Sequence, residues 1–533
     1  MKLYLMLLIC FVNSLCYAQD NKYIISKPLD IKEAGMNRIL CMKNGNTLLF
    51  HFEKGKKIVV KVFDSTHKLI ASQRDDYQLM NFHLDFLIRG LFEANGEAVL
   101  FFDQELNSRH CLIRIRYNSQ TGNLVEEKLV AESNSANKRI LFYVMKNKES
   151  ENYEVLFCTD KNHPKESDLY CIFFDNKHNS IKEVQLPVDR KKYDGLEIVG
   201  AESQQNDLLI TVSLTKTLVF ARGGSGGPIQ YNSSTDDHFL QFFYIPMDSK
   251  NMSTIVLHLS TGVFPYYSYY TYNPFAQMLN LFLYSYKAID YQFGRSVEDG
   301  FTSRNLFFKI DPQNISSLGV NDIKNTIAND SLKKETDTSN YFLGIPLKMY
   351  TNENGLSTLI SKSVKSPQAY TSNIVYLSEY VGITQFDDNG NEIWGTVLPG
   401  VQHYSALIRN YRQFPLSSGY SGNDQNPVDY NVYSCNKNFY IIFNDYDTNF
   451  TNTLKDKGLL VYSFEKTNGM CYKINNKKEV TKSYLFGAPG IGDYKYCFLE
   501  SADFDEQRGV YSSLVRYRKN NKTTLCVAWC HLD

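Results

Sequence analysis

The feature that most constrains the fold is a unit of short strand-like runs, joined by tight turns, that recurs along the chain. It is clearest in residues 438–474, where the apolar and aromatic runs 439–443 and 458–464 are followed by a turn at 467–469 and the run 470–474. Such runs suit a pleated, half-buried surface, and Asn-Gly within the turn accepts the positive φ angles that a two-residue hairpin needs. The pattern predicts consecutive antiparallel strands.

Composition agrees with a β protein and excludes one class of partner. The 533 residues include 38 Tyr and 34 Phe but only 2 Trp, and aromatic residues favour strands. Lysine plus arginine equals aspartate plus glutamate, at 57 each. Because there is no broad basic field, we expect no nucleic-acid partner and no attraction to an anionic membrane.

The first eighteen residues predict a secretory signal peptide. Lys2 precedes an apolar core over residues 3–12, and Cys16 and Ala18 occupy the positions that favour cleavage before Gln19. The mature protein is therefore expected to be periplasmic, cell-surface or extracellular. A lipid anchor on Cys16 is the alternative, which lacks the usual small residue before the cysteine. No later apolar stretch reaches about 18 residues, so no transmembrane segment is predicted.

The repeated units predict a β-propeller. They begin near residues 39, 87, 138, 196, 266, 344, 428 and 485. Units of four strands over roughly 40 to 50 residues are typical of propeller blades, which stack on their neighbours in a closed ring. We predict an all-β fold with a single propeller of eight blades over residues 39–533, with seven blades as the alternative. Residues 19–38 would supply a strand that closes the ring.

One stretch carries a resemblance to a group of known proteins. Residues 381–394 form a strand, an Asp-Asp-Asn-Gly turn and a second strand that ends at Trp394. This unit is similar to those of the secreted bacterial β-propeller repeat superfamily. The chain has neither the Trp-Asp dipeptides of WD repeats nor the paired glycines of kelch repeats. The resemblance implies the fold and not the function, because propellers include enzymes, receptors and scaffolds.

The extra length is concentrated in residues 221–430. The expected insertions are 222–238, 285–305, 311–340 and 413–429. Long loops in a compact domain are often functional, and consecutive blades are neighbours in the ring, so one arc is expected to be elaborated. The alternative is that these are solvent-exposed loops that have drifted, because loops tolerate insertion at little cost.

The tyrosine-rich stretch 264–275 contains the first candidate ligand-binding residues. On an extended strand Tyr266, Tyr270 and Tyr272 would share one face, where flat rings and hydroxyls suit sugar rings or an extended peptide. Trp394 is a fourth candidate. The alternative is that these rings pack in the core or between blades, as most aromatic residues of β proteins do.

A second candidate site is a calcium loop. Asp445, Asp447 and Asn449 alternate as the first ligands of such a loop do, and Asp456 stands at the twelfth position. Phe450 occupies the position that normally requires glycine, and the flanking runs are strand-like. A loop rich in Asp and Asn for turn formation is the alternative. We expect no other cofactor.

Other motifs give weaker predictions. Gly-Gly-Ser-Gly-Gly at 223–227 matches the pattern of a nucleophilic serine but lacks a following helix, so a loop is expected. Residues 526–531 contain two cysteines and a histidine at a spacing one residue too long for haem attachment, so a final strand is expected. Nine cysteines remain after signal cleavage, and Cys158 with Cys171 is the pair considered for a disulfide.

These features favour an exported, monomeric, non-catalytic binding or scaffold protein that recognises a protein, peptide or glycan. One alternative is a propeller enzyme, either a glycoside hydrolase or lyase or a peptidase, with a site at the mouth of the channel. The sequence does not expose such a site, because its residues would converge only in space. Another alternative is a structural component of the cell envelope.

Overall fold

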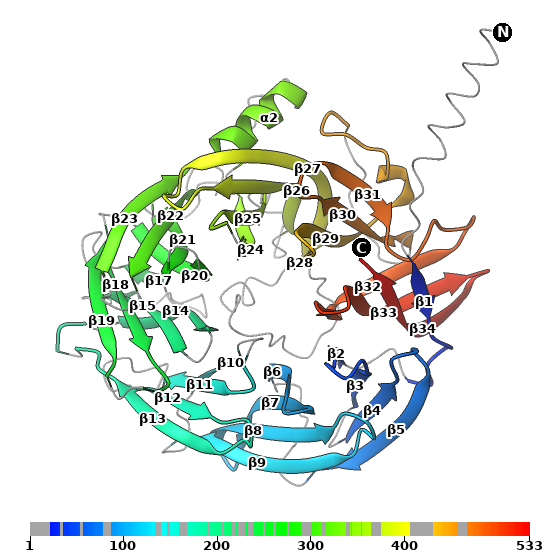
Figure 1. Ribbon diagram of the computed structural model, residues 1–533, viewed down its shortest axis with the longest axis horizontal. Helices are drawn as coiled ribbons and strands as arrows, with labels where there is room; N and C mark the ends of the chain where they lie inside the picture. Colours follow the sequence, from blue (N-terminus) through cyan, green and yellow to red (C-terminus); the bar gives the residue numbers. More distant parts are fainter. Residues whose placement is uncertain are drawn as a thin grey trace.

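The computed structural model is a ring of eight four-stranded antiparallel sheets (Figure 1). The predicted eight-bladed propeller is therefore confirmed, and the seven-bladed alternative is wrong. The structure describes residues 22–532 except 32–35, 54–56, 78–86, 134–139, 147–149, 159–167, 190, 194, 205–206, 216–218, 222–229, 233–237, 249–250, 260–262, 274–276, 289–300, 312–315, 337–341, 343, 353, 364–374, 406–429 and 457–465.

In blades 1 to 4 the strands follow one another from the inside of the ring to the outside. Blade 1 comprises β2 (Met36–Cys41), β3 (Thr47–Glu53), β4 (Lys57–Phe63) and β5 (Leu69–Asp76), and blade 2 comprises β6 (Leu87–Ala94), β7 (Glu97–Leu106), β8 (Arg109–Asn118) and β9 (Leu124–Glu132). Blade 3 comprises β10 (Leu141–Met145), β11 (Tyr153–Cys158), β12 (Leu169–Phe174) and β13 (Ser180–Leu186). Blade 4 comprises β14 (Gly195–Gln204), β15 (Asp207–Thr215), β18 (His238–Ile245) and β19 (Ser253–His258), with the hairpin β16 (Val219–Ala221) and β17 (Gln230–Asn232) between its second and third strands.

Blades 5 to 7 repeat this order, and blade 8 takes its outer strand from the start of the chain. Blade 5 comprises β20 (Val263–Asn273), β21 (Met278–Ala288), β22 (Phe301–Asp311) and β23 (Ser316–Ile323), and blade 6 comprises β24 (Ile345–Thr351), β25 (Ser357–Lys362), β26 (Val375–Phe386) and β27 (Glu392–Ser405). Blade 7 comprises β28 (Asn431–Cys435), β29 (Asn438–Asp445), β30 (Asn468–Ile474) and β31 (Val480–Tyr484), and blade 8 comprises β32 (Tyr494–Asp505), β33 (Val510–Lys519), β34 (Lys522–His531) and β1 (Tyr23–Ile25). Helix α2 (Thr326–Thr336) lies between blades 5 and 6, and the short 3-10 helix η4 (Asp447–Asn449) follows β29.

The two ends of the chain meet in blade 8. β1 pairs antiparallel with β34, with Tyr23 opposite Cys530. Beyond β1, the backbone N–H groups of Ser26 and Leu29 still donate to carbonyls of β34, at 2.8 Å in both cases. The segment that runs beside β34 is thus longer than β1 itself, although only its first part is regular strand.

Alternation along the strands places apolar side chains on both faces of every blade. In β3, for example, Leu48 and Phe50 pack in the cluster shared with blade 2, while Leu49 packs in the cluster shared with blade 8. Eight such clusters of buried side chains each join two adjacent blades. The core of the protein is therefore divided among the blade interfaces, as stacked sheets require.

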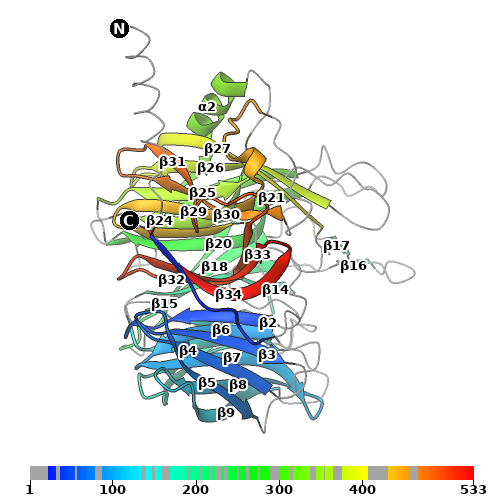
Figure 2. The same ribbon diagram turned by 90° about the vertical axis from the view of Figure 1, so that its right-hand side faces the viewer.

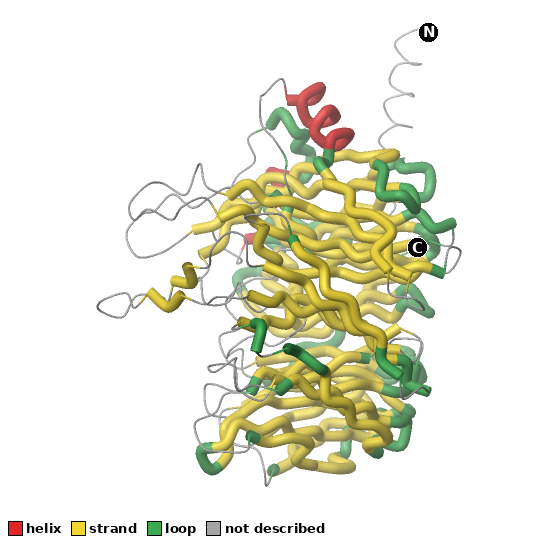
Figure 3. Tube along the Cα trace, turned by 90° about the vertical axis from the view of Figure 1, so that its left-hand side faces the viewer, coloured by secondary structure: helices red, strands yellow, loops and turns green. Residues whose placement is uncertain are grey.

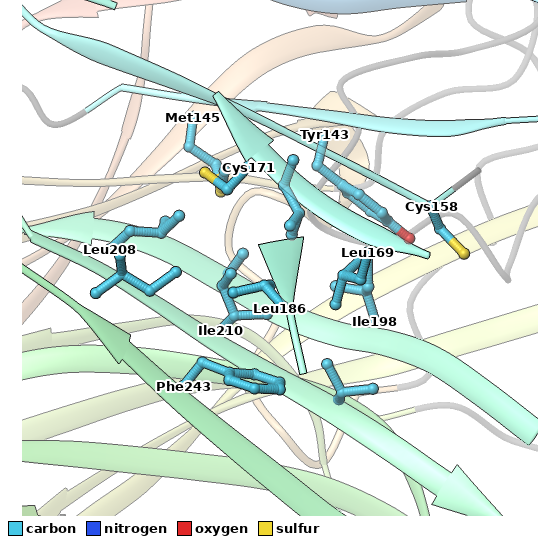
Figure 4. Packing of buried hydrophobic residues seen from close by; sticks show 14 of the residues in the cluster. Tyr143, Met145, Cys158, Leu169, Cys171, Leu186, Ile198, Leu208, Ile210 and Phe243 are labelled. Carbon is cyan, nitrogen blue, oxygen red and sulfur yellow. The ribbon is translucent and has the colours of Figure 1, made fainter. Parts of the chain in front are cut away.

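Figure 4 shows the interface between blades 3 and 4, which also contains the cysteine pair considered for a disulfide. Cys158 lies opposite Leu169 and Cys171 lies opposite Leu156, so the two cysteines are diagonal neighbours across β11 and β12. Both are buried, and no disulfide joins them. They pack as small apolar side chains rather than as a bridge.

Helix α2 packs on the outer part of blade 6, outside the ring (Figure 1). Ala328 and Leu332 on one side of the helix are buried with Phe342 and Val397. The close approach depends on Gly395 in β27, because a Cβ atom there would lie 2.7 Å from the backbone nitrogen of Ala328. The helix therefore docks on a site where the strand has no side chain.

Two local expectations differ from the structure. Asn468 and Gly469 do not form a hairpin turn: they begin β30 and lie opposite Asp445 and Asn444, so β29 and β30 are joined by the longer segment 446–467. Much of 311–340 is regular structure, namely β23 and α2, rather than loop. The predicted strand 458–464 and the Gly-Ser motif 223–227 lie outside the described residues. The final strand expected at 526–531 is the second half of β34.

Candidate functional site

The two ends of the ring carry different connections. Strands alternate in direction within a blade, so the links from first to second strand and from third to fourth all lie at one end, here called the turn end. Its longest links are 146–152 and 246–252. At the opposite end, here called the loop end, the links include 216–237, 324–344 and 406–430. Hairpin β16–β17 stands away from the blades on this side, and the C-terminus lies on the other (Figures 2 and 3).

The predicted tyrosine platform belongs to β20, the inner strand of blade 5. Tyr270 and Tyr272 lie opposite Leu281 and Leu279, but the register shifts between Pro265 and Tyr267, so Tyr266 is an extra residue in the strand. Simple alternation therefore does not extend from Tyr266 to the other two tyrosines. The side chains of all three lie outside the described residues. A ligand-binding role for them stays a prediction.

Trp394 lies far from that strand in the fold, in the outer strand β27 of blade 6. Its ring is part-buried against the apolar cluster between blades 6 and 7. The ammonium group of Lys478, from the turn between β30 and β31, lies 5.4 Å from the ring centroid. Trp394 thus makes an inter-blade contact at the periphery and does not share a strand or a blade with the tyrosines.

The candidate calcium ligands Asp445, Asp447 and Asp456 accept hydrogen bonds from different partners. Asp445 accepts from the side-chain amide of Asn449 at 2.7 Å, whereas Asp447 accepts from Asn468 at 2.8 Å. Asp456 accepts from the backbone N–H of Thr453 at 2.6 Å, in a turn of its own. Over the part of the chain that the structure describes, no cluster of three or more His, Cys, Asp or Glu residues is arranged to hold a metal ion. Calcium binding here stays a prediction.

Asp445 instead forms an ion pair with Lys482 in an apolar setting. The Nζ atom of Lys482 lies 3.7 Å from the carboxylate. The same ammonium group lies between 5.5 and 5.7 Å from the ring centroids of Phe443, Phe450 and Tyr472. Burial raises the pKa of Asp445 to about 6 although Lys482 opposes the shift, and burial also lowers the pKa of Lys482. Both groups are therefore held at a cost in desolvation.

A row of aromatic rings crosses blade 3 at the loop end. Phe142 on β10, Phe157 on β11 and Tyr170 on β12 are cross-strand partners. Ring centroids are 6.0 Å apart between Phe142 and Phe157 and 5.5 Å apart between Phe157 and Tyr170, and the second pair is stacked. His110 of blade 2 stacks on Phe142 at 5.8 Å. The row runs from a buried inner end to a half-exposed outer end at Phe157 and Tyr170.

Buried charges fix the inner end of the row. His110 Nε2 lies 2.7 Å from a carboxylate oxygen of Asp103, and Arg89 donates through Nε to the other oxygen at 2.6 Å. The backbone N–H of Ile140 donates to Nδ1 of His110 at 3.1 Å. His110 is thus oriented from both sides and holds the Phe142 ring in place.

Polar groups flank the outer end of the row. Gln185 on β13 lies opposite Tyr170, and its side-chain amide donates to Asp168 at 3.2 Å. The Tyr170 hydroxyl also hydrogen-bonds to Asp168. Desolvation raises the pKa of Tyr170, and the carboxylates of Asp168 and Glu183 add to the shift, so the phenol stays neutral. An aromatic face with an adjacent carboxylate and carboxamide can bind a ligand that is itself partly apolar and partly hydroxylated.

Sequence reasoning did not identify this row. Its members are one aromatic residue from each of three strands and a histidine from the preceding blade, so nothing in the local sequence distinguishes them. The available signal was the strand register: aligning the centres of 141–145, 153–158 and 169–174 as antiparallel neighbours would have placed the rings side by side.

Comparisons with solved structures give similarities at low sequence identity and low TM-score. The chain is similar to an ulvan-degrading polysaccharide lyase (10% identity, TM-score 0.38, covering 88% of this chain and 94% of the other). It is also similar to a protein from Lactobacillus plantarum (10% identity, TM-score 0.35, covering 84% of this chain and 95% of the other). A third similar structure is an acylaminoacyl peptidase from Pyrococcus horikoshii (8% identity, TM-score 0.34, covering 84% of this chain and 52% of the other). The chain thus spans about half the length of that peptidase. No protein-family model and no curated protein matches the sequence. These similarities leave activity and partners open.

Within the part of the chain that the structure describes, no helix combines the length and the apolar character needed to cross a bilayer.

Proposed function

We propose that this protein is an exported recognition module that binds a protein, peptide or glycan at the loop end of the propeller. The observation that supports this is the difference between the two ends. Links at the turn end are short, whereas the loop end carries links such as 216–237 and 406–430. Binding residues are commonly placed on loops held by a rigid scaffold, and eight blades joined by apolar interfaces are such a scaffold.

The candidate contact residues lie in different blades. Tyr266, Tyr270 and Tyr272 come from the inner strand of blade 5, which follows the blade with the 216–237 link. Tyr266 lies nearer the loop end of β20, whereas Tyr270 and Tyr272 lie nearer its turn end, so a ligand bound at the loop end would have to extend along this inner strand to meet all three. Trp394 lies beside Lys478 at the outer edge of blade 6 and toward the turn end, so it is a contact only for a ligand that extends beyond the loop end to that edge.

Export is the second part of the proposal. It rests on residues 1–18, which have the charge, apolar core and cleavage pattern of a signal peptide. None of the nine cysteines beyond this segment forms a disulfide, and all except Cys41 are buried. A protein with this arrangement can fold in an oxidising compartment without disulfides, because thiols shielded from solvent are slow to oxidise.

A capture experiment tests the proposal. The full chain, expressed with its own leader, is purified from envelope and medium fractions, used in a pull-down from envelope extract and screened against a glycan panel. We expect a mature N-terminus at Gln19 and specific capture. Changing Tyr266, Tyr270 and Tyr272 together to alanine should weaken capture at least about tenfold, since aromatic contacts dominate many interfaces.

The design separates folding from binding. Circular dichroism and thermal unfolding of the triple variant must match the unchanged protein; a variant that fails to fold would place the three rings in the core. Hydrolysis or elimination products released from a bound polysaccharide or peptide would favour the enzyme alternative. Failure of the intact protein to retain any partner or glycan would contradict a recognition role.

A further inference from the structure

The outer end of the aromatic row is accompanied by a cavity. It measures about 270 Å³ and is lined by Asp168, Leu169, Gln185, Leu186, Pro187 and Val188. Asp168 and Leu169 stand at the start of β12, and residues 185–188 span the last two residues of β13 and the two that follow it, so the cavity lies at the loop end of blade 3. Its volume is just below the range of roughly 300–1,000 Å³ that holds drug-sized ligands, and it therefore suits one ring of a larger molecule.

Two polar residues of the cavity lining, Asp168 and Gln185, also neighbour Tyr170, which lies beside the cavity and is not part of its lining. Gln185 lies directly across the strand pair from Tyr170 and is exposed, as is Asp168. Phe157 and Tyr170 are half-buried, with their rings stacked at an interplanar angle of 22°. A ligand in the cavity would therefore meet a carboxylate and a carboxamide beside the edge of an aromatic pair.

The charge around Tyr170 narrows the ligand class. Asp168 and Glu183 both act on its hydroxyl through their negative charges. A carboxylate or sulfate group on the ligand would be repelled here, whereas hydroxyl groups can donate to Asp168 and accept from the Gln185 amide. A peptide strand is less well matched, because strand addition uses a free sheet edge and this cavity lies across the strand ends.

We propose that Tyr170, Asp168 and Gln185 form a subsite for one ring of an uncharged carbohydrate. The apolar face of the sugar packs against Tyr170 beside Phe157, and its hydroxyl groups bond to the carboxylate and the carboxamide. This assignment deepens the proposed recognition function and rests on it. It places a binding position in blade 3, outside the arc that holds the tyrosines of blade 5.

Titration calorimetry of the full chain tests the subsite. The probes are neutral oligosaccharides of hexoses and matched oligosaccharides in which a hexose is replaced by its uronate. We expect a neutral probe to bind and the uronate to bind more weakly. Tyr170→Ala should reduce the affinity about tenfold, and Tyr170→Phe, which keeps the ring, should reduce it by no more than about threefold. Asp168→Asn should narrow the difference between the neutral and uronate probes.

Ile181→Ala is the matched control, because Ile181 is exposed on the same strand as Gln185 but at its other end. It should bind as the unchanged protein does. If Tyr170→Ala does not fold, Tyr170→Phe and Gln185→Ala carry the comparison. The subsite is overturned if no neutral oligosaccharide binds at millimolar concentration, or if Tyr170→Ala and Gln185→Ala bind the neutral probe as tightly as the unchanged protein does. Capture of a protein partner that is insensitive to Tyr170→Ala would overturn the subsite while leaving the recognition function intact.

Discussion

At the scale of single residues, Glu154 on β11 is a buried acid whose pKa is strongly raised. Only 1% of its surface is exposed. One carboxylate oxygen accepts from the Ser203 hydroxyl at 3.2 Å, and the other has no hydrogen-bond partner among the described residues. Burial raises its pKa to about 8, although Ser203 and Lys146 oppose the shift. The side chain is therefore protonated at neutral pH, and blade 3 meets blade 4 through an uncharged carboxyl group.

This predicts that stability falls as the solution becomes alkaline. The pKa in the folded state lies above the ordinary value of 4.5, so the stabilisation is complete below pH 4.5 and is lost as pH rises through about 8. The contribution changes by at most about 1.4 kcal/mol per pH unit within this window. Glu154→Gln should remove the dependence and be the more stable protein at pH 8. Urea unfolding at pH 5 and pH 8 measures the free energy of unfolding, and Glu183→Gln, at an exposed position, is the control. If this free energy changes with pH equally in Glu154→Gln and in the unchanged protein, the prediction is wrong.

At the scale of elements, one turn recurs that the sequence did not make obvious. In several turns an Asp or Asn side chain accepts backbone N–H groups two and four residues later, and the residue three positions later has positive φ. The first residues are Asp64, Asp175, Asn352, Asp387 and Asn475. Glycine is the usual residue at a position of positive φ. In three of these turns that position is occupied by His67, His178 or Lys478, so glycine does not mark those turns in the sequence.

A second element-scale prediction concerns the seat of α2 on blade 6. Gly395→Ala places a methyl group 2.7 Å from the backbone nitrogen of Ala328, and backbone cannot rotate away as a side chain can. We expect a loss of roughly 1–3 kcal/mol in the free energy of unfolding and faster amide exchange across residues 326–336. Ile393→Ala, on the same strand and 42% exposed, is the control. If amide exchange in α2 is the same in Gly395→Ala as in the unchanged protein, the contact between α2 and β27 does not stabilise the helix.

At the scale of the whole molecule, the blades could be predicted from the sequence, whereas the aromatic row of blade 3 could not. Blade number follows from local signals, namely alternating apolar runs and turn residues, and each start was predicted within about ten residues because each unit is continuous in sequence. A site such as the row from His110 to Tyr170 depends on register between strands and on contact between blades. Those relations involve residues that are distant in sequence, and no single segment encodes them.

Closure of the ring leads to the last prediction. β34 is paired on one side with β33 and on the other with β1, and Tyr23 in β1 packs beside Gly487, where a Cβ atom would lie 2.7 Å from the ring. The ammonium group of Lys495 lies 5.1 Å from the same ring. A chain that begins at Lys27 would lose these contacts and leave the outer edge of β34 unpaired. Such an edge can pair with a second copy of the protein.

We therefore expect the shortened chain to unfold at a lower temperature, with a loss of roughly 1–3 kcal/mol, and to form dimers or larger species as its concentration rises. Thermal unfolding and sedimentation velocity measure the two effects. Ile24→Thr is the control, because Ile24 is 38% exposed and the substitution keeps the β1 backbone that pairs with β34. If the shortened chain melts with the control and sediments as a single species, the eight blade interfaces hold the ring without the N-terminal strand, and the pairing of β1 is not what protects β34 from a second copy of the protein.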